Sequence, residues 1–199
     1  MKEKELVEQE KQEKKKKKDP EEINIFHELF QLLVYFVIVC VVVFFVNKYV
    51  TQRNVVDGDS MYPTLHDKDC VMIDKLSYRF HEPERFDIIV FPYNEEERIF
   101  YIKRIIALPG ETVQIINGEI YVNDTVLEED YGYEAIADYT MGTAKTPITL
   151  GEDEYFVLGD NRNNSIDSRD EDVGLIKREE IRGKACFRIF PLKRIGTIK

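Results

Sequence analysis

The stretch "TVQIINGEIYVN", residues 112–123, decides the fold class of this chain. Two short β-prone runs flank Asn117-Gly118, a pair that tolerates the positive φ values of a two-residue hairpin turn. Working outward, similar runs rich in Val, Ile, Phe and Tyr recur between turn residues, at 70–76, 86–91, 99–108, 154–159 and 184–192. The pattern predicts a mainly β protein built on antiparallel sheet. Residues 124–153 are rich in Asp, Glu, Gly and Tyr, so we expect a smaller β insertion over about 111–153.

The segment "LLVYFVIVCVVVFFV", residues 32–46, holds no charge, and residues 23–31 extend its apolar character. A helix over 23–46 is long enough to cross a bilayer. A cleavable leader is disfavoured, because the charged region before the run is long and no small-x-small cleavage pattern follows it. A helix buried in a soluble core is disfavoured, because the run is apolar all round. We therefore expect one N-terminal transmembrane anchor.

Charge on either side of this anchor predicts its orientation. Residues 1–22 carry eight lysines and eight acidic residues and almost no aliphatic side chain, so they are expected to form a disordered tail. Only Lys48 and Arg53 follow closely after the anchor. The positive-inside rule then places the tail in the cytoplasm and residues 47–199 outside the cell membrane.

The charge of residues 47–199 and the spacing of the cysteines in the chain disfavour some functions. They contain 29 acidic and 20 basic residues, which disfavours nucleic acid as a partner, because phosphate contacts need a basic face. Cys40, Cys70 and Cys186 show no CxxC spacing, so zinc or thioredoxin-like chemistry is not expected. A disulfide between Cys70 and Cys186 stays open at this stage.

Two segments carry candidate reactive groups. In "GDSMYPTL", residues 58–65, Ser60 lies in a sharp turn beside an apolar methionine, although a serine in a turn is often only structural. In "IFYIKRIIAL", residues 99–108, strand periodicity places Lys103 and Arg104 on opposite faces, each among apolar neighbours. Burial disfavours the ammonium form, so such a lysine can act as a general base near neutral pH. Arginine stays protonated, so Arg104 should pair with a carboxylate.

A third segment, "GDNRNNSIDSR", residues 159–169, packs polar side chains into one loop that suits a hydrogen-bonding scaffold. A calcium loop is disfavoured, because Arg162 stands where a second ligand is needed. His66 lies six residues after Ser60, but it is better explained as a surface residue than as the base of a Ser-His-Asp triad.

These three segments, in this order behind an N-terminal anchor, closely resemble the bacterial type I signal peptidases, especially those of Gram-positive organisms. The resemblance covers about residues 55–190. It implies that Ser60, in the Ser-Met-x-Pro-Thr motif, is the nucleophile and that Lys103, in Tyr-Ile-Lys-Arg, is the general base. Some members carry a hydroxyl two residues before the nucleophile, where this chain has Gly58, so another group must complete the oxyanion hole.

The resemblance also assigns supporting and binding roles. Ser165 should hydrogen-bond to Lys103 and orient it, Asp160 should pair with Arg104, and Asp167 with Arg169. Asn163 stands where many relatives have aspartate and is given no catalytic role. The residues expected to line shallow pockets for small substrate side chains are Val56, Met61, Leu65, Tyr101 and Ile102.

The implied activity is removal of signal peptides from exported preproteins after an Ala-x-Ala site, at the outer face of the cell membrane. The implied partners are preproteins and membrane lipid, with no metal or cofactor. A self-cleaving repressor-type Ser-Lys peptidase is the enzymatic rival, but those proteins are soluble and carry a DNA-binding segment. An inactive, membrane-anchored β-rich binding module is the rival from another class.

Overall fold

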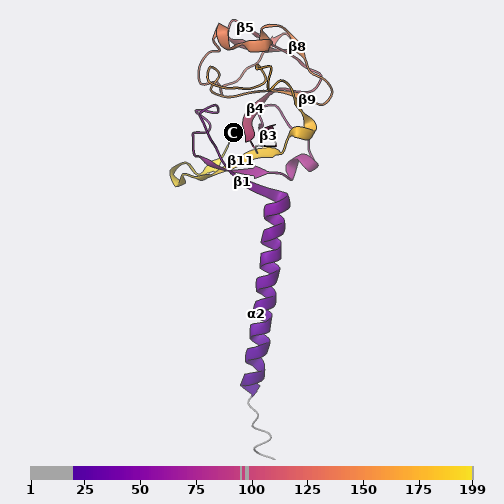
Figure 1. Ribbon diagram of the computed structural model, residues 1–199, viewed down its shortest axis with the longest axis vertical. Coiled ribbons are helices and arrows are strands. Elements are labelled where there is room, and N and C mark those ends of the chain that lie inside the picture. The colour runs from indigo at the N-terminus through magenta and orange to yellow at the C-terminus, as the bar shows by residue number, and fades with distance from the viewer. Residues whose placement is uncertain (1–19, 95, 97–98, 199) are drawn as a thin grey trace, which may run out of the picture. The chain divides into compact units, whose positions relative to one another are not determined.

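The computed structural model describes residues 20–94, 96 and 99–198 (Figure 1). The chain divides into two units between Val46 and Asn47. Residues 1–19 of the expected cytoplasmic tail lie outside the described residues, whereas residues 20–22 belong to a helix.

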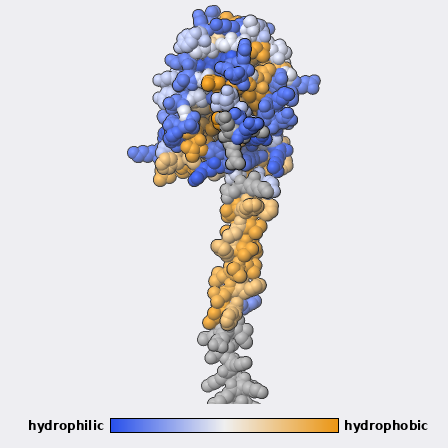
Figure 2. All heavy atoms as spheres, viewed as in Figure 1, coloured by the Kyte–Doolittle hydropathy of each residue, from blue (hydrophilic) through white to orange (hydrophobic). Residues whose placement is uncertain are grey.

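The first unit contains one long helix, α2 (Pro20–Phe45), which leads into a single π-helical turn, η1 (Val46–Val50). Its 21-residue stretch Ile25–Phe45 is long and apolar enough to cross a membrane. Its Val, Leu, Ile and Phe side chains are exposed along the described length, which Figure 2 shows as a continuous hydrophobic surface. A helix that is apolar on all sides, with no protein packed against it, suits a lipid environment.

The second unit is built around a sheet of eight strands. The strand order is β1-β2-β11-β3-β4-β9-β10, with β12 paired to β11, and every pairing is antiparallel. The strands are β1 (Thr51–Val55), β2 (Cys70–Asp74), β3 (Ile88–Asn94), β4 (Ile99–Ala107), β9 (Glu154–Leu158), β10 (Ile176–Lys177), β11 (Gly183–Phe190) and β12 (Gly196–Thr197). This architecture, with the apolar N-terminal helix, confirms the predicted fold class.

A smaller sheet has the order β7-β6-β5-β8. Its strands are β5 (Thr112–Ile116), β6 (Glu119–Val122), β7 (Thr125–Val126) and β8 (Ile148–Thr149). Asn117 and Gly118 join β5 to β6 with φ values of 49° and 85°, as the hairpin signal predicts. A Cβ on Gly118 would lie 2.9 Å from the Ile136 carbonyl oxygen, so the turn packs closely against the segment that connects β7 to β8.

Short 3-10 turns connect the strands, at η2 (Ser77–Arg79), η3 (Asp138–Thr140), η4 (Gly142–Lys145), η5 (Arg178–Glu180) and η6 (Leu192–Arg194). The central strands are apolar on both faces because both faces are covered. Phe156 and Leu158 of β9 pack in one cluster with Val113, Ile115 and other residues of the smaller sheet. The two sheets therefore share a core. Cys70 and Cys186 are both free in this structure.

Candidate active site

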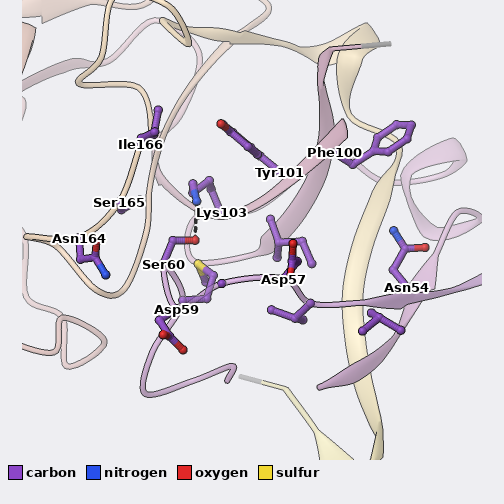
Figure 3. Close-up of a pocket in the computed structure, with 15 residues that line it drawn as sticks. Asn54, Asp57, Asp59, Ser60, Phe100, Tyr101, Lys103, Asn164, Ser165 and Ile166 are labelled. Carbon is purple, nitrogen blue, oxygen red and sulfur yellow. Dashed lines mark hydrogen bonds between the residues drawn. The ribbon is translucent and has the colours of Figure 1, made fainter. Parts of the chain in front are cut away.

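Ser60 and Lys103 come from different elements and meet at the edge of a cavity (Figure 3). Ser60 lies in the turn after β1, and Lys103 lies in the middle of β4, paired with Ile89 of β3. The Lys103 Nζ atom donates a hydrogen bond of 2.7 Å to Ser60 Oγ. The geometry therefore joins a hydroxyl to an amine at a distance suited to proton transfer.

The Lys103 ammonium is unusually easy to deprotonate. The side chain is 3% exposed. This burial is the main cause that lowers the pKa of Lys103 to about 8, and Arg169 also lowers it, whereas Asp167 and Asp160 oppose the fall. The Tyr101 ring also faces the amine, with Nζ 5.1 Å from the ring centroid. Lys103 is thus neutral in about half of the molecules near pH 8, far below the usual range of a lysine, as a general base requires.

Arg104, the next residue of β4, is held by a carboxylate, as expected. Its Nε donates to Asp160 Oδ1 at 2.8 Å and its Nη2 to Oδ2 at 2.7 Å, and both side chains are fully buried. Thr64 Oγ1 also donates to Asp160 Oδ2, at 2.5 Å. The Tyr131 ring covers the guanidinium, with its centroid 3.6 Å from Cζ. This pair fixes the loop after β9 to both β4 and the turn that carries Ser60.

Asp167 and Arg169 form the second expected pair. Arg169 Nε donates to Asp167 Oδ1 at 2.7 Å and Nη2 to Oδ2 at 2.8 Å. The Gly159 N–H donates to the same carboxylate at 3.0 Å. The Asp167 carboxylate therefore joins Gly159, at the start of the loop, to Arg169, at its end.

Ser165 differs from the expectation. Its hydroxyl lines the cavity beside Lys103, but it has no hydrogen-bond partner among the residues that the structure describes. The Lys103 amine instead directs its hydrogen bond to Ser60 Oγ, so the expected contact from Ser165 to Lys103 is absent from this arrangement. Gly159 makes room for Ser165, because a Cβ there would lie 2.2 Å from Ser165 Oγ.

The cavity beside the pair has a volume of about 510 Å³. Four of the five residues expected in the substrate pockets line it: Val56, Met61, Tyr101 and Ile102. Leu65 does not. Its N–H bonds to the Met61 carbonyl at 2.8 Å, which turns its side chain into the core, where it is fully buried. Residues that the sequence reading missed also line the cavity: Asn54, Val55, Asp57, Asp59, Phe100, Asn164 and Ile166.

Gly58 lies on the cavity wall with φ +93°, a conformation that favours glycine. No other group approaches within 4 Å of the place where a Cβ would stand. The Gly58 N–H is already used, because it donates to Asp67 Oδ1 at 2.9 Å. Apart from the two chain neighbours, open space therefore lies where a side chain at position 58 would stand.

Two polar residues of the 159–169 loop have contacts that the sequence reading did not anticipate. Arg162 is 2% exposed and forms an ion pair with Glu129. Asn163 bonds to residues 135–140 through both atoms of its amide. The only available signal was the density of polar residues in the loop.

The described contacts of His66 do not involve Ser60. The His66 ring packs against Tyr62, with centroids 4.9 Å apart, and the His66 N–H bonds to Asp69. Within residues 20–94, 96 and 99–198, no group of three or more His, Cys, Asp or Glu residues could hold a metal ion.

An antiparallel β unit with a serine hydroxyl bonded to a buried lysine fits the class of Ser/Lys hydrolases. Residues 29–190 match the family model described as signal peptidase, peptidase S26. A signal peptidase I from Leptolyngbya laminosa is 39% identical over 160 residues, 77% of this chain and 75% of its own. Signal peptidase I S from Bacillus subtilis (strain 168) is 35% identical over 170 residues, 80% of this chain and 88% of its own. This chain belongs to the signal peptidase family, peptidase S26, which confirms the resemblance to type I signal peptidases.

Among solved structures, a signal peptidase I from Enterococcus faecalis V583 aligns with 52% of this chain and 97% of its own, at 35% identity and a TM-score of 0.43. The family assignment rests on the family model and on the sequence relatives.

Proposed function

We propose that this chain is a membrane-anchored serine endopeptidase that removes signal peptides from exported preproteins, with Ser60 as nucleophile and Lys103 as general base. The observation that carries the proposal is the 2.7 Å contact between Ser60 Oγ and an amine whose pKa burial lowers to about 8. The family membership supplies the reaction class, and the geometry of this chain supports the roles of the two side chains.

In the proposed reaction, neutral Lys103 takes the proton of Ser60 Oγ while this oxygen attacks the scissile carbonyl carbon. The resulting ammonium gives the proton to the leaving amine, so that an acyl-enzyme forms. Lys103 then takes a proton from a water molecule while this water attacks the ester carbonyl carbon, and it returns the proton to Ser60 Oγ as the bond between Oγ and the acyl carbon breaks. Ser165, whose hydroxyl lines the same cavity without a partner in the described chain, is available to accept a hydrogen bond from Lys103 when Ser60 is acylated.

Oxyanion stabilisation is assigned to the Ser60 backbone N–H together with a second donor. The Gly58 N–H bonds to Asp67, so it is not free for this role. A water molecule in the open space beside Gly58 is the donor that we propose. Each pre-aimed donor contributes roughly 3 kcal/mol to lowering the barrier.

Substrate selection is assigned to the shallow cavity. Val56, Met61, Tyr101 and Ile102 give it apolar walls suited to small side chains, such as those of an Ala-x-Ala site. Helix α2 is proposed to anchor the chain in the cell membrane, with the N-terminus cytoplasmic and residues 47–199 outside. Sharing the membrane with a membrane-held substrate raises the effective concentration of the scissile segment, and apolar surface near the cavity would contact lipid.

Cleavage of a preprotein with an Ala-x-Ala site, by the full-length chain in detergent, tests the proposal. Ser60→Ala and Lys103→Ala should each lower kcat on the order of 10⁴-fold or more, because each removes a reacting group. The acid limb of kcat/KM should fall near pH 8 as Lys103 becomes protonated. Persistent cleavage in either variant would exclude the pair, and a parent protein that binds the preprotein without cleaving it would favour a binding module.

A further inference from the structure

A segment of the smaller sheet region, which has no assigned role, binds the loop that lines the active site. We name residues 127–147, which connect β7 to β8, the clamp segment, and residues 159–169 the catalytic loop. We propose that Glu129 of the clamp segment is a positioning residue for Ser60, acting through Arg162 and Gly159 of the catalytic loop. This inference rests on the proposed function of Ser60 and Lys103, and it adds a role for a part of the chain that carries no motif.

The first link is an ion pair between Glu129 and Arg162. Arg162 Nη2 donates to Glu129 Oε2 at 2.7 Å, and Nη1 donates to Oε1. The side chains are 2% exposed for Arg162 and 11% for Glu129. A cation this deeply buried needs its counter-charge, so Glu129 determines where the guanidinium lies.

The second link joins Arg162 to the backbone of Ser60. The third nitrogen of the guanidinium, Arg162 Nε, donates a hydrogen bond to the Gly159 carbonyl oxygen at 3.0 Å. Gly159 lies directly against the nucleophile, since a Cβ there would be 2.4 Å from the Ser60 carbonyl oxygen. The backbone N–H of Asn161, which lies between Gly159 and Arg162 in sequence, donates to the Ser60 carbonyl oxygen at 3.0 Å. A displacement of Arg162 would therefore move Gly159 and, through the close contact of Gly159 with the Ser60 carbonyl, the backbone of Ser60.

Other contacts hold the catalytic loop to the clamp segment in the same place. Asn163 Oδ1 accepts hydrogen bonds from Ala137 N and Thr140 Oγ1, and its Nδ2 donates to the Ala135 carbonyl. Arg169 Nη1 donates to the Thr140 carbonyl at 3.0 Å. These bonds keep the two segments together along their length, so that Glu129 presents its carboxylate to Arg162 in one position.

The environment of Lys103 gives this role a specific signature. Burial is the main cause that lowers the pKa of Lys103, and the catalytic loop also provides charged groups that act on it, Asp167 and Asp160 raising the pKa and Arg169 lowering it, while the Tyr101 ring lies beside the amine from β4. The loop also provides Ser165 to the cavity wall. If the loop shifts away, water reaches the amine and the desolvation that lowers its pKa is partly lost. The acid limb of the pH profile then moves to higher pH, which a loss of stability alone does not cause.

The test compares Glu129→Gln with a matched control, Glu111→Gln, in the full-length chain. Glu111 pairs with Arg85 at 2.5 Å and is 19% exposed, and within the part of the chain that the structure describes its hydrogen bonds go to Arg85, Leu108 and Leu150, outside the catalytic loop and the Ser60 turn. The readouts are kcat, KM and the acid limb for an Ala-x-Ala preprotein, with thermal unfolding measured alongside. Glu129→Gln should lower kcat on the order of 10- to 100-fold with little change in KM, and raise the acid limb. Glu111→Gln should lower the unfolding temperature and leave kcat and the acid limb as in the parent.

A double variant, Glu129→Gln with Arg162→Gln, separates positioning from the cost of an unpaired buried charge. It has no unpaired charge, so it should recover stability, yet it lacks the guanidinium that holds Gly159, so kcat should stay low and the acid limb raised. It also replaces the single variant if that variant does not fold.

Recovery of the parent kcat by the double variant would overturn the inference, as would an acid limb that does not move in either variant. Parent cleavage that is lost in Ser60→Ala would show that the proposed function holds even where the inference fails. A parent that does not cleave would overturn both.

Discussion

The eight-stranded sheet and the four-stranded sheet differ in what they give to the site. The larger sheet and its turns provide Ser60, Lys103 and the wall of the cavity. The smaller sheet provides no cavity residue among those described, but its clamp segment binds the catalytic loop. The larger sheet region thus holds the proposed reacting groups, and the smaller sheet region holds residues that support them, although the two sheets share a core.

The contacts themselves differ in kind. Arg104 of the larger sheet and Asp160 of the catalytic loop form an ion pair through their side chains, so this contact requires both residue types. Many clamp contacts instead reach backbone groups, such as the bonds from Asn163 to Ala135 and from Arg169 to Thr140. A backbone partner can belong to almost any residue, so a supporting segment can lack a motif and still matter.

The largest expected effect breaks the joint that Arg104 and Asp160 form between the larger sheet and the catalytic loop. Asp160→Asn should lower the free energy of unfolding by about 3–5 kcal/mol, because it removes the charge of a carboxylate that binds the fully buried Arg104 guanidinium through two hydrogen bonds. Chemical denaturation at pH 7 measures this change.

Asp170→Asn is the control for this variant. Asp170 is exposed and follows the catalytic loop directly, so its change should stay within about 0.5 kcal/mol. An Asp160→Asn protein as stable as the Asp170→Asn protein would show that Arg104 finds another partner and that the joint does not depend on this ion pair.

A second prediction concerns the larger sheet alone. Lys103→Met should raise the free energy of unfolding at pH 7 by about 3 kcal/mol while abolishing cleavage, since a pKa near 8 in the folded chain against 10.5 unfolded means that burial disfavours the ammonium. The unfolded chain holds the Lys103 proton more tightly than the folded chain does. The loss of free energy of unfolding that the buried ammonium causes in the parent is therefore complete below pH 8.

The penalty disappears as the pH rises from 8 through 10.5, and the advantage of Lys103→Met should shrink over that interval. Denaturant midpoints at pH 7 and pH 10 measure this. An advantage that is equal at both pH values would mean that packing, and not deprotonation, is responsible.

The sequence predicts much of the larger sheet region and few of the contacts that the clamp segment makes with the catalytic loop. The Asn117-Gly118 hairpin, the buried lysine and the need of Arg104 for a carboxylate follow from local patterns and charge, whereas Asp160 and Asp167 as the partners of Arg104 and Arg169 follow from the family resemblance. Leu65 could not be placed, because the turn from Met61 that buries it is set by packing. The partner of Arg162 could not be predicted either, because Glu129 lies 33 residues away in a segment without periodicity.

The smallest expected effect tests whether the smaller region acts through its contacts or only through its stability. Ile115→Val removes one methylene from the shared core, where Ile115 is 2% exposed, and should cost about 0.5–1.5 kcal/mol. The clamp contacts lie on other residues, so kcat and the acid limb should equal those of the parent. Thermal unfolding and a pH profile of kcat/KM measure the two quantities on one sample. A raised acid limb in Ile115→Val would mean that any weakening of the smaller sheet hydrates Lys103, and that Glu129 has no special role.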